Sequence, residues 1–261
     1  MIKPRKNQYL SNRELLAEIH KSKKSFAWSA DDFSWNFDLI LPEEKELYKL
    51  RPTRVKEIAK EKSMDKALEE EGPTYTIHDV VVRVMNTDHI PDGTKRRRIA
   101  NSFTYKVKTN FPPFKHFRIK PEITKFPYEW YECARSHWKG DLELGEFSSQ
   151  HGIMTDNLAR AFLKLCKRYS TRANWRGYTY VDEMRAQALL QLSQVGLQFD
   201  ESKSSNPFSY YTQAVTNSFT GILNNEKKHQ HIRDDLLEKN GLSPSYTRQL
   251  DNAKHLYIEE T

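Results

Sequence analysis

The clearest pattern of hydrophobic and polar positions lies in the C-terminal part of the chain, from about residue 152. Apolar residues there recur at steps of three and four, which is the spacing of an amphipathic helix. The first such stripe consists of Leu158, Phe162, Leu165 and Tyr169. The next predicts a helix from about Val181 to Leu197 and consists of Met184, Ala188, Leu192 and Val195.

A third helix is predicted to start at Asn206-Pro207, because asparagine suits a helix cap and proline the first helical position. One face of this helix carries Phe208, Tyr211, Val215, Ser218 and Ile222, and another carries Tyr210, Gln213 and Asn217. A further helix is expected over Ile232 to Lys239, ending near Gly241. The remaining residues, 241–261, are mostly polar and predict a flexible tail.

The N-terminal half has weaker patterns. Ser11 and Glu14 have the spacing of a capping box, which predicts a helix within residues 1–25. Pro42 and the acidic residues after it favour another helix start. Residues 74–120 read as a small β-containing segment, with Phe103, Tyr105 and Val107 in strand alternation, and residues 121–150 read as mostly loop.

Charge changes this picture by pointing to a polyanionic partner. The chain has 261 residues and a formal net charge of +7. Segment 156–233 holds eleven lysines and arginines against six acidic residues, so most of the excess lies there. Cationic side chains contact phosphates, while aromatic faces and amides contact unpaired bases. An ordinary helical bundle with a solvated basic face accounts for the same features.

The chain contains neither a Walker A loop nor a G-x-G-x-x-G motif, the usual sequence signatures of a phosphate-binding loop. Cys133 and His137 have a spacing that suits one helix face, but two ligands do not make a zinc site. Glu226 and Asp92 resemble fragments of nuclease motifs. We therefore expect no cofactor, no metal and no enzymatic activity. Two isolated cysteines, no signal peptide and no membrane-spanning stretch favour a reducing cytoplasmic compartment.

Several segments resemble sigma factors of the sigma-70 class, most closely the late-transcription sigma factors of T-even-like tailed phages. The similarity runs over roughly 152–235, with a short match at 11–19. It is carried by Phe199-Asp200, the run from Asn206 to Gln213, the run from Asn174 to Met184, and Phe219 to Lys228.

The resemblance implies a mainly α fold, with a sigma region-2-like helical bundle over 151–240 that binds polymerase core and promoter. The N-terminal helix within 1–25 would pack on this core. Residues 26–150 would then be a small α+β insertion of unknown role, where Lys95 to Arg98 suit phosphate contact or form a solvated loop.

The family also implies roles for single residues. The helix that ends at Phe199-Asp200 would bind the clamp helices of the largest subunit of bacterial RNA polymerase core, through Asp182, Glu183, Arg185, Gln187 and Gln191. In the next helix, Tyr211 is the first candidate to stack on a flipped promoter base and Tyr210 the second, although Tyr211 also suits core packing. The other DNA-binding candidates are Lys203, Gln213, Asn217, Lys227 and Lys228.

Two departures from the family matter. Ala214 and Val215 stand where the family places two tryptophans, so we expect poor promoter melting without a late coactivator. The 28 residues after Arg233 are too few for the domain that reads the distal promoter element. Leu256, Tyr257 and Ile258 are candidates to bind a phage sliding clamp, and a frayed acidic end is the alternative.

The resemblance thus predicts a phage sigma factor that directs host RNA polymerase to late promoters through a short A/T-rich element. It would act in the cytoplasm of the infected bacterium, with no membrane partner. Two other functions stay open: a standalone basic DNA- or RNA-binding protein, and a metal-dependent nuclease that uses Glu226 or Asp92.

Overall fold

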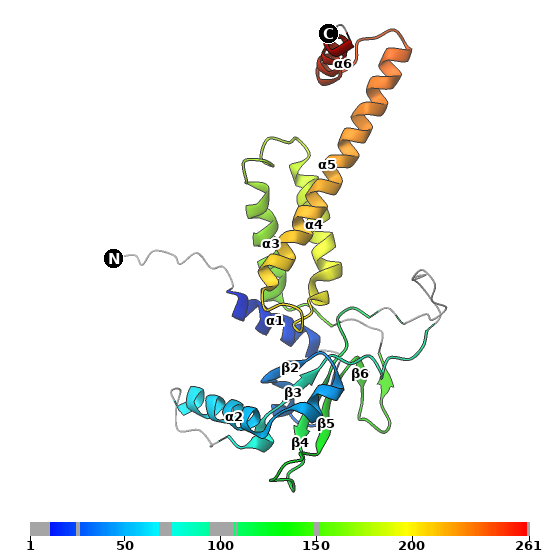
Figure 1. The fold of residues 1–261 in the computed structure, drawn as a ribbon. Coiled ribbons are helices and arrows are strands. Elements are labelled where there is room, and N and C mark those ends of the chain that lie inside the picture. The colour runs from blue at the N-terminus through cyan, green and yellow to red at the C-terminus, as the bar shows by residue number, and fades with distance from the viewer. Residues whose placement is uncertain are drawn as a thin grey trace. The chain divides into compact units, whose positions relative to one another are not determined.

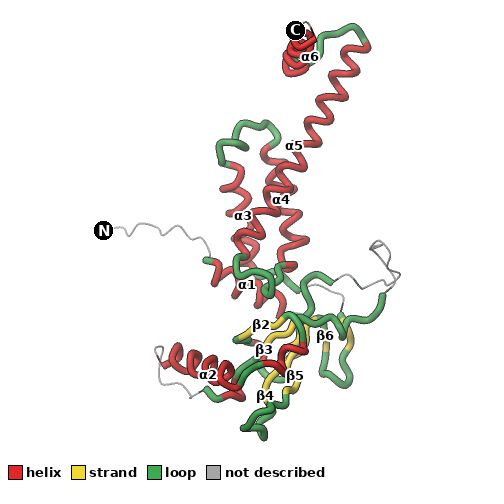
Figure 2. Tube along the Cα trace, viewed as in Figure 1, coloured by secondary structure: helices red, strands yellow, loops and turns green. Residues whose placement is uncertain are grey.

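The computed structural model describes residues 11–24, 27–67, 75–93, 107, 109–148 and 152–259, with the backbone alone for 65–67 and 254–259. The fold is mainly α with a small mixed sheet. The chain divides into two compact units. Unit 1 comprises residues 1–161 and 193–210, and unit 2 comprises 162–192 and 211–261. The strands of the described residues, yellow in Figure 2, all fall within the residue ranges of unit 1.

Unit 1 is built on a five-stranded sheet with the order β1-β5-β4-β3-β2 (Figure 1). Strands β2 and β3 pair in parallel, and the other neighbours are antiparallel. The strands are β1 (Ala27–Ser29), β2 (Leu39–Leu41), β3 (Val82–Val84), β4 (Lys115–Ile119) and β5 (Trp130–Ser136). A separate two-stranded sheet pairs β6 (Trp138–Lys139) with β7 (Glu146–Phe147).

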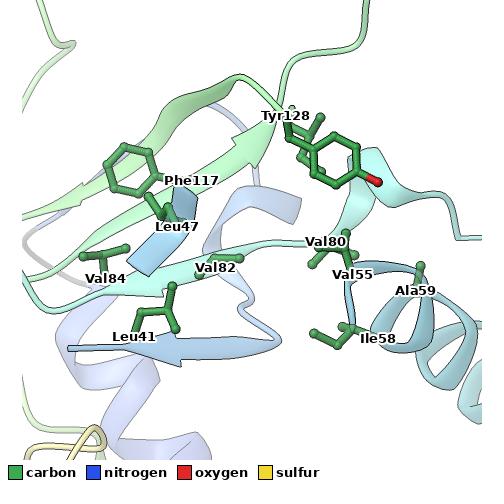
Figure 3. Close-up of a cluster of buried hydrophobic side chains, with 11 residues drawn as sticks. Leu41, Leu47, Val55, Ile58, Ala59, Val80, Val82, Val84, Phe117 and Tyr128 are labelled. Atoms are coloured by element: carbon green, nitrogen blue, oxygen red, sulfur yellow. The ribbon is translucent and has the colours of Figure 1, made fainter. Parts of the chain in front are cut away.

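One face of this sheet is apolar. Successive residues of a strand point to opposite faces, so Val82 and Val84 share a face that excludes Arg83. Both valines pack in a cluster with Val55 and Ile58 of α2 (Pro52–Ala67), as Figure 3 shows. The short 3-10 helices η2 (Glu44–Lys49) and η3 (Ile77–Asp79) border this core, and η1 (Phe33–Trp35) lies near β4 and β5.

Unit 2 is a helical bundle with an aromatic core. It contains most of α3 (Asp156–Ser170), α4 (Val181–Val195) and α5 (Pro207–Lys239), all of α6 (Tyr246–Glu259), and the α3–α4 loop. The core is closed by edge-to-face ring pairs, in which Phe162 meets Tyr211 at 4.7 Å between centroids and Tyr169 meets Phe219 at 5.2 Å. Trp175, from the loop, contacts the same Phe219 ring at 5.3 Å.

Several predicted helix signals are confirmed. The Ser11–Glu14 capping box is formed, because each residue's backbone N–H donates to the other's side chain, and α1 (Asn12–Lys24) follows it. Helices α3 and α4 lie where their apolar stripes placed them. Helix α5 begins at Pro207, with the Ser209 N–H donating to the capping Asn206 Oδ1 at 3.0 Å.

Other predictions were wrong. The helix expected separately at Ile232 to Lys239 is the end of α5, which runs unbroken because no proline interrupts it and its only glycine, Gly221, lies in open space. A helix, α6, occupies most of the segment expected to be a flexible tail. Residues 121–150 contain β5, although they were expected to be mostly loop. This strand was missed because its signal in the sequence is short and flanked by polar residues.

The β-containing segment was placed too narrowly. Strands β3 and β4 fall within 74–120, but β1, β2 and β5 lie outside it and complete the same sheet. Such pairings between distant segments leave no local signal in a sequence. Phe103, Tyr105 and the run Lys95 to Arg98 lie outside the described residues.

Candidate nucleic-acid interface

The loop before α5 is shaped by short polar contacts within unit 1. Asp200 Oδ1 accepts from the Ser202 N–H at 3.0 Å and from its hydroxyl at 2.6 Å. Lys203 lies 3.2 Å from the other Asp200 oxygen, and its side chain is 82% exposed. The candidate cation Lys203 is therefore accessible to a phosphate group.

The two candidate stacking tyrosines have different environments. Tyr211 is 1% exposed and meets Phe162 edge to face, so the structure gives it the packing role that the sequence left open. Tyr210 is partly exposed; its hydroxyl donates to the Val195 carbonyl at 3.3 Å, and its ring meets Phe199 edge to face at 5.6 Å. The preference for Tyr211 is thus corrected, because a ring enclosed in a core offers no face to a base.

In unit 2, α5 presents a polar face. Gln213, Asn217, Lys227 and Lys228 are all exposed. The Gln213 Nε2–H donates to Asn217 Oδ1 at 2.8 Å, one turn along the helix. Ala214 and Val215, which stand where the sigma family has two tryptophans, do not lie on this face. Val215 is fully buried and Ala214 is partly buried. The helix therefore exposes amides and ammonium groups at this face.

The predicted polymerase-binding residues on α4 differ in exposure. Asp182, Glu183 and Gln187 are exposed, whereas Arg185 and Gln191 are partly buried. Arg185 lies 3.2 Å from Asp182, three residues away. Three of the four residues predicted for the buried stripe of α4, Met184, Ala188 and Leu192, are buried, and Val195 is partly buried. The packing of α4 leaves Asp182, Glu183 and Gln187 accessible, whereas Arg185 and Gln191 border the buried stripe.

Unit 1 also contains a buried ionic cluster that the sequence did not reveal. Glu201, one residue after Asp200, is 3% exposed in its side chain and lies 2.7 Å from the Lys23 ammonium of α1. It lies 3.3 Å from His20 and 3.5 Å from Arg83 of β3. Lys23 also donates to the Phe199 carbonyl at 2.9 Å. The loop before α5 is thereby tied to both α1 and the sheet.

Burial and mutual attraction shift the titration of this cluster. Burial alone would raise the pKa of Glu201, but the charges of Lys23 and Arg83 and a hydrogen bond from His20 outweigh it and hold that pKa well below its usual value. Desolvation lowers the pKa of Lys23 to about 8 and that of Arg83 to about 10. The negative charge of Glu201 limits both decreases in pKa.

Arg83 is fixed by aromatic rings as well as by charge. Its guanidinium carbon lies 3.8 Å from the centroid of Phe37 and 3.9 Å from that of Phe114. Its Nε–H donates to His116 Nε2 at 2.9 Å, and His116 Nδ1 lies 2.8 Å from the Ser34 carbonyl. Burial, followed by the charge of Arg83, lowers the pKa of His116 well below its usual value, so the ring is neutral at pH 7.

Sequence reasoning missed Lys23, Arg83 and Glu201 for a physical reason. Charged residues are rarely buried unless paired, and their partners here lie up to 178 positions apart. The one available signal was Arg83 within a β-branched run, where a charge interrupts a strand that is otherwise apolar.

The remaining candidates are placed as follows. Leu256, Tyr257 and Ile258 lie on α6, but their side chains are outside the described residues. Cys133 is fully buried and desolvation raises its pKa to about 12, and His137 is buried in a stack with Phe111. Across the described ranges, no three His, Cys, Asp or Glu side chains gather in a way that suits a metal ion.

The nuclease candidates lie in different units, Asp92 in unit 1 and Glu226 in unit 2. Comparisons with protein-family models, with curated proteins and with solved structures found no match to this chain. Within the part of the chain that is described, no helix combines the length and apolar character needed to cross a membrane.

Proposed function

We propose that this chain is a phage sigma factor that directs bacterial RNA polymerase core to promoters with a short A/T-rich element. The observation that carries the proposal is the order of features around α5. A helix with an exposed acidic and amide face, α4, is followed by the Phe199-Asp200 loop and then by a capped helix with an exposed amide face. This order matches the resemblance noted in the sequence.

In this proposal α4 binds the clamp helices of the largest polymerase subunit. Glu183 and Gln187 lie one turn apart and both are exposed, so they can meet a partner helix together. Asp182 adds a second carboxylate at the start of α4. Arg185 and Gln191, being partly buried, border this surface.

In this proposal the first residues of α5 recognise the promoter. Tyr210 replaces Tyr211 as the residue that stacks on a flipped base, since its ring is partly exposed. Flipping costs a few kcal/mol of unstacking, and stacking on an aromatic ring recovers about 1–3 kcal/mol per base. Because Ala214 and Val215 supply no aromatic wedge, we expect open-complex formation to depend on a coactivator.

The test is a pull-down with purified RNA polymerase core, followed by run-off transcription from an A/T-rich late-type promoter. The double variant Glu183→Ala, Gln187→Ala should lose core binding, while the exposed acid Glu143 changed to Ala should retain it. Tyr210→Ala should weaken open-complex formation and leave core binding intact. Absence of core binding by the unmodified chain would overturn the proposal.

A second function is favoured by the exposed cations of α5. A standalone DNA-binding protein would use Lys227 and Lys228 on phosphates without any polymerase. DNA binding that is unchanged by added core, together with no promoter-specific transcript, would support this function instead.

A further inference from the structure

We propose that a second copy of this chain binds to the exposed second half of α5, so that two α5 helices pair in antiparallel orientation about a two-fold axis. The contact surface is the α5 seam, which we define as Ile222, Asn225, His229, Ile232 and Leu236. This inference goes beyond the proposed function and does not depend on it, because it concerns the contact of the chain with itself.

The α5 seam has the spacing of a coiled coil. Its five residues follow one another at steps of three, four, three and four, which keeps them along one side of the helix. Ile222 is partly buried, and the other four members are exposed. Figure 1 shows α5 continuing past the α3–α4 loop. The second half of α5 therefore presents the seam to solvent.

The far end of the seam is apolar and uncovered. Ile232 is 48% exposed and Leu236 is 54% exposed. Helix α6 is held on another side of α5, where the Ser245 hydroxyl accepts from Gln230 at 3.0 Å and donates to Asp234 at 2.7 Å. Asp234 is turned by about 160° from Ile232 around the helix, so α6 does not cover the seam. Burying this apolar strip against a partner is favourable.

Antiparallel pairing sets the register of the seam. Alternate seam positions then face each other, so Ile232 lies opposite His229 of the second copy and Leu236 lies opposite Asn225. The two-fold axis repeats each of these contacts. A polar residue in such a seam costs stability but fixes the register, so His229 and Asn225 make the pair weaker and more specific.

The charges beside the seam are complementary to those of an antiparallel second copy. In this register Arg233 lies beside Glu226 of the second copy, and Lys228 lies beside Asp235. Lys228 and Arg233 are exposed, and neither forms an ion pair within the part of the chain that the structure describes. Asp235 is 3.0 Å from Arg248 of its own chain and exposed enough to contact a second cation. By symmetry, four contacts between opposite charges would flank the seam.

Parallel pairing would bring like charges together. In a parallel coiled coil the charged position before one seam residue meets the position five residues later on the partner, so Lys228 would lie beside Arg233 of the second copy. The two α3–α4 bundles would also lie at the same end of the pair, whereas antiparallel pairing places them at opposite ends. Both considerations favour the antiparallel orientation.

The size of the seam predicts a weak pair. From Ile222 to Leu236 it is about 21 Å long, at about 1.5 Å of rise per residue. A contact of this length lies at the low end of specific protein interfaces. We therefore expect a dimer that forms in the micromolar range and dissociates on dilution.

The experiment measures self-association of the full chain by analytical ultracentrifugation across a series of micromolar concentrations. The unmodified chain should shift from monomer to dimer as its concentration rises. Arg233→Glu should raise the dimer dissociation constant about 10-fold or more, because it makes two attractive contacts repulsive. Arg176→Glu, in the exposed α3–α4 loop, makes the same change of charge away from the seam and should leave the constant unchanged.

A charge exchange tests the orientation. The double variant Glu226→Arg, Arg233→Glu restores opposite charges in an antiparallel pair, so it should recover most of the affinity lost in Arg233→Glu. In a parallel pair, Arg233→Glu alone would attract Lys228 and strengthen association. Leu236→Ala should weaken the pair and leave the melting temperature of the dilute monomer unchanged, because this side chain is exposed.

The outcomes are distinguishable from those of the proposed function. A chain that stays monomeric at the highest concentration, or a dimer that Arg233→Glu strengthens or that Leu236→Ala leaves unchanged, would overturn the antiparallel pair. Core binding and promoter-specific transcription by a chain that stays monomeric would leave the sigma proposal standing. A dimer that responds to Arg233→Glu and to the charge exchange, formed by a chain that does not bind core, would keep the pair and remove the sigma proposal.

Discussion

The two units use charged side chains in opposite ways. In unit 1, Lys23, Arg83 and Glu201 are buried together, and their geometry is fixed by mutual contacts and by the rings of Phe37 and Phe114. In unit 2, Lys227 and Lys228 are exposed on α5. The buried charges therefore hold a loop in place, whereas the exposed charges are accessible to an external polyanion.

The largest expected effect comes from removing the carboxylate of the buried cluster. Glu201→Ala should lower the free energy of unfolding by about 3–5 kcal/mol, because it leaves two buried cations without their carboxylate. Urea denaturation measures this. The exposed acid Glu143 changed to Ala should stay within about 0.5 kcal/mol of the unmodified chain. A loss below about 1 kcal/mol for Glu201→Ala would show that the cluster does not hold the loop.

Tyr211 and Tyr210 are neighbours on α5, and we expect them to differ in their contribution to stability. Tyr211→Ala should cost about 3–5 kcal/mol of stability, as expected for removing a large buried ring. Tyr211→Phe keeps the ring and should cost much less. Tyr210→Ala should destabilise less than Tyr211→Ala, because Tyr210 is partly exposed. Thermal melts of the three variants provide the measurement, and an undiminished melting temperature in Tyr211→Ala would contradict its core role.

Acid should weaken the folded chain through the buried cluster. The pKa values of His20 and His116 lie below 6.5, and that of Glu201 lies below 4.5. In each case the unfolded chain binds more protons, so stability falls as pH drops through these values. The loss should begin below about pH 6.5 and steepen below about pH 4.5. Denaturation midpoints from pH 8 to 2 measure it. Glu201→Gln should flatten the lower part of the curve, and a flat profile in the unmodified chain would contradict the prediction.

The smallest effect concerns the corner between α5 and α6. Asp234 is buried and accepts two hydrogen bonds from Ser245, whereas its neighbour Asp235 is exposed and lies beside Arg248. Asp234→Ala should speed amide hydrogen exchange in 246–253 and leave 211–224 unchanged, because only the α6 attachment is lost. Asp235→Ala should speed exchange less, because an exposed ion pair contributes little to stability. Equal exchange in both variants would indicate that α6 is held by other contacts.

Local signals predicted the helices well and the sheet poorly. The Ser11–Glu14 box, the stripe on α4 and the Asn206-Pro207 start each concern residues within one helix, and the structure has all three. Strands β1, β2 and β5 were not predicted, because they are short and pair with distant segments. The length of α5 was also missed, since its polar second half lacks the apolar stripe that marks a packed helix.

For the candidate site, the residue types on α4 and α5 could be predicted from the sequence, because helical spacing alone sets which side chains share a face. The enclosure of Tyr211 and the partial exposure of Tyr210 could not, since they depend on Phe162 from another helix. Only the tertiary structure brought Lys23, Arg83 and Glu201 together. Their pairing depends on contacts between segments far apart in the chain, and a buried charge is tolerated only where such partners meet.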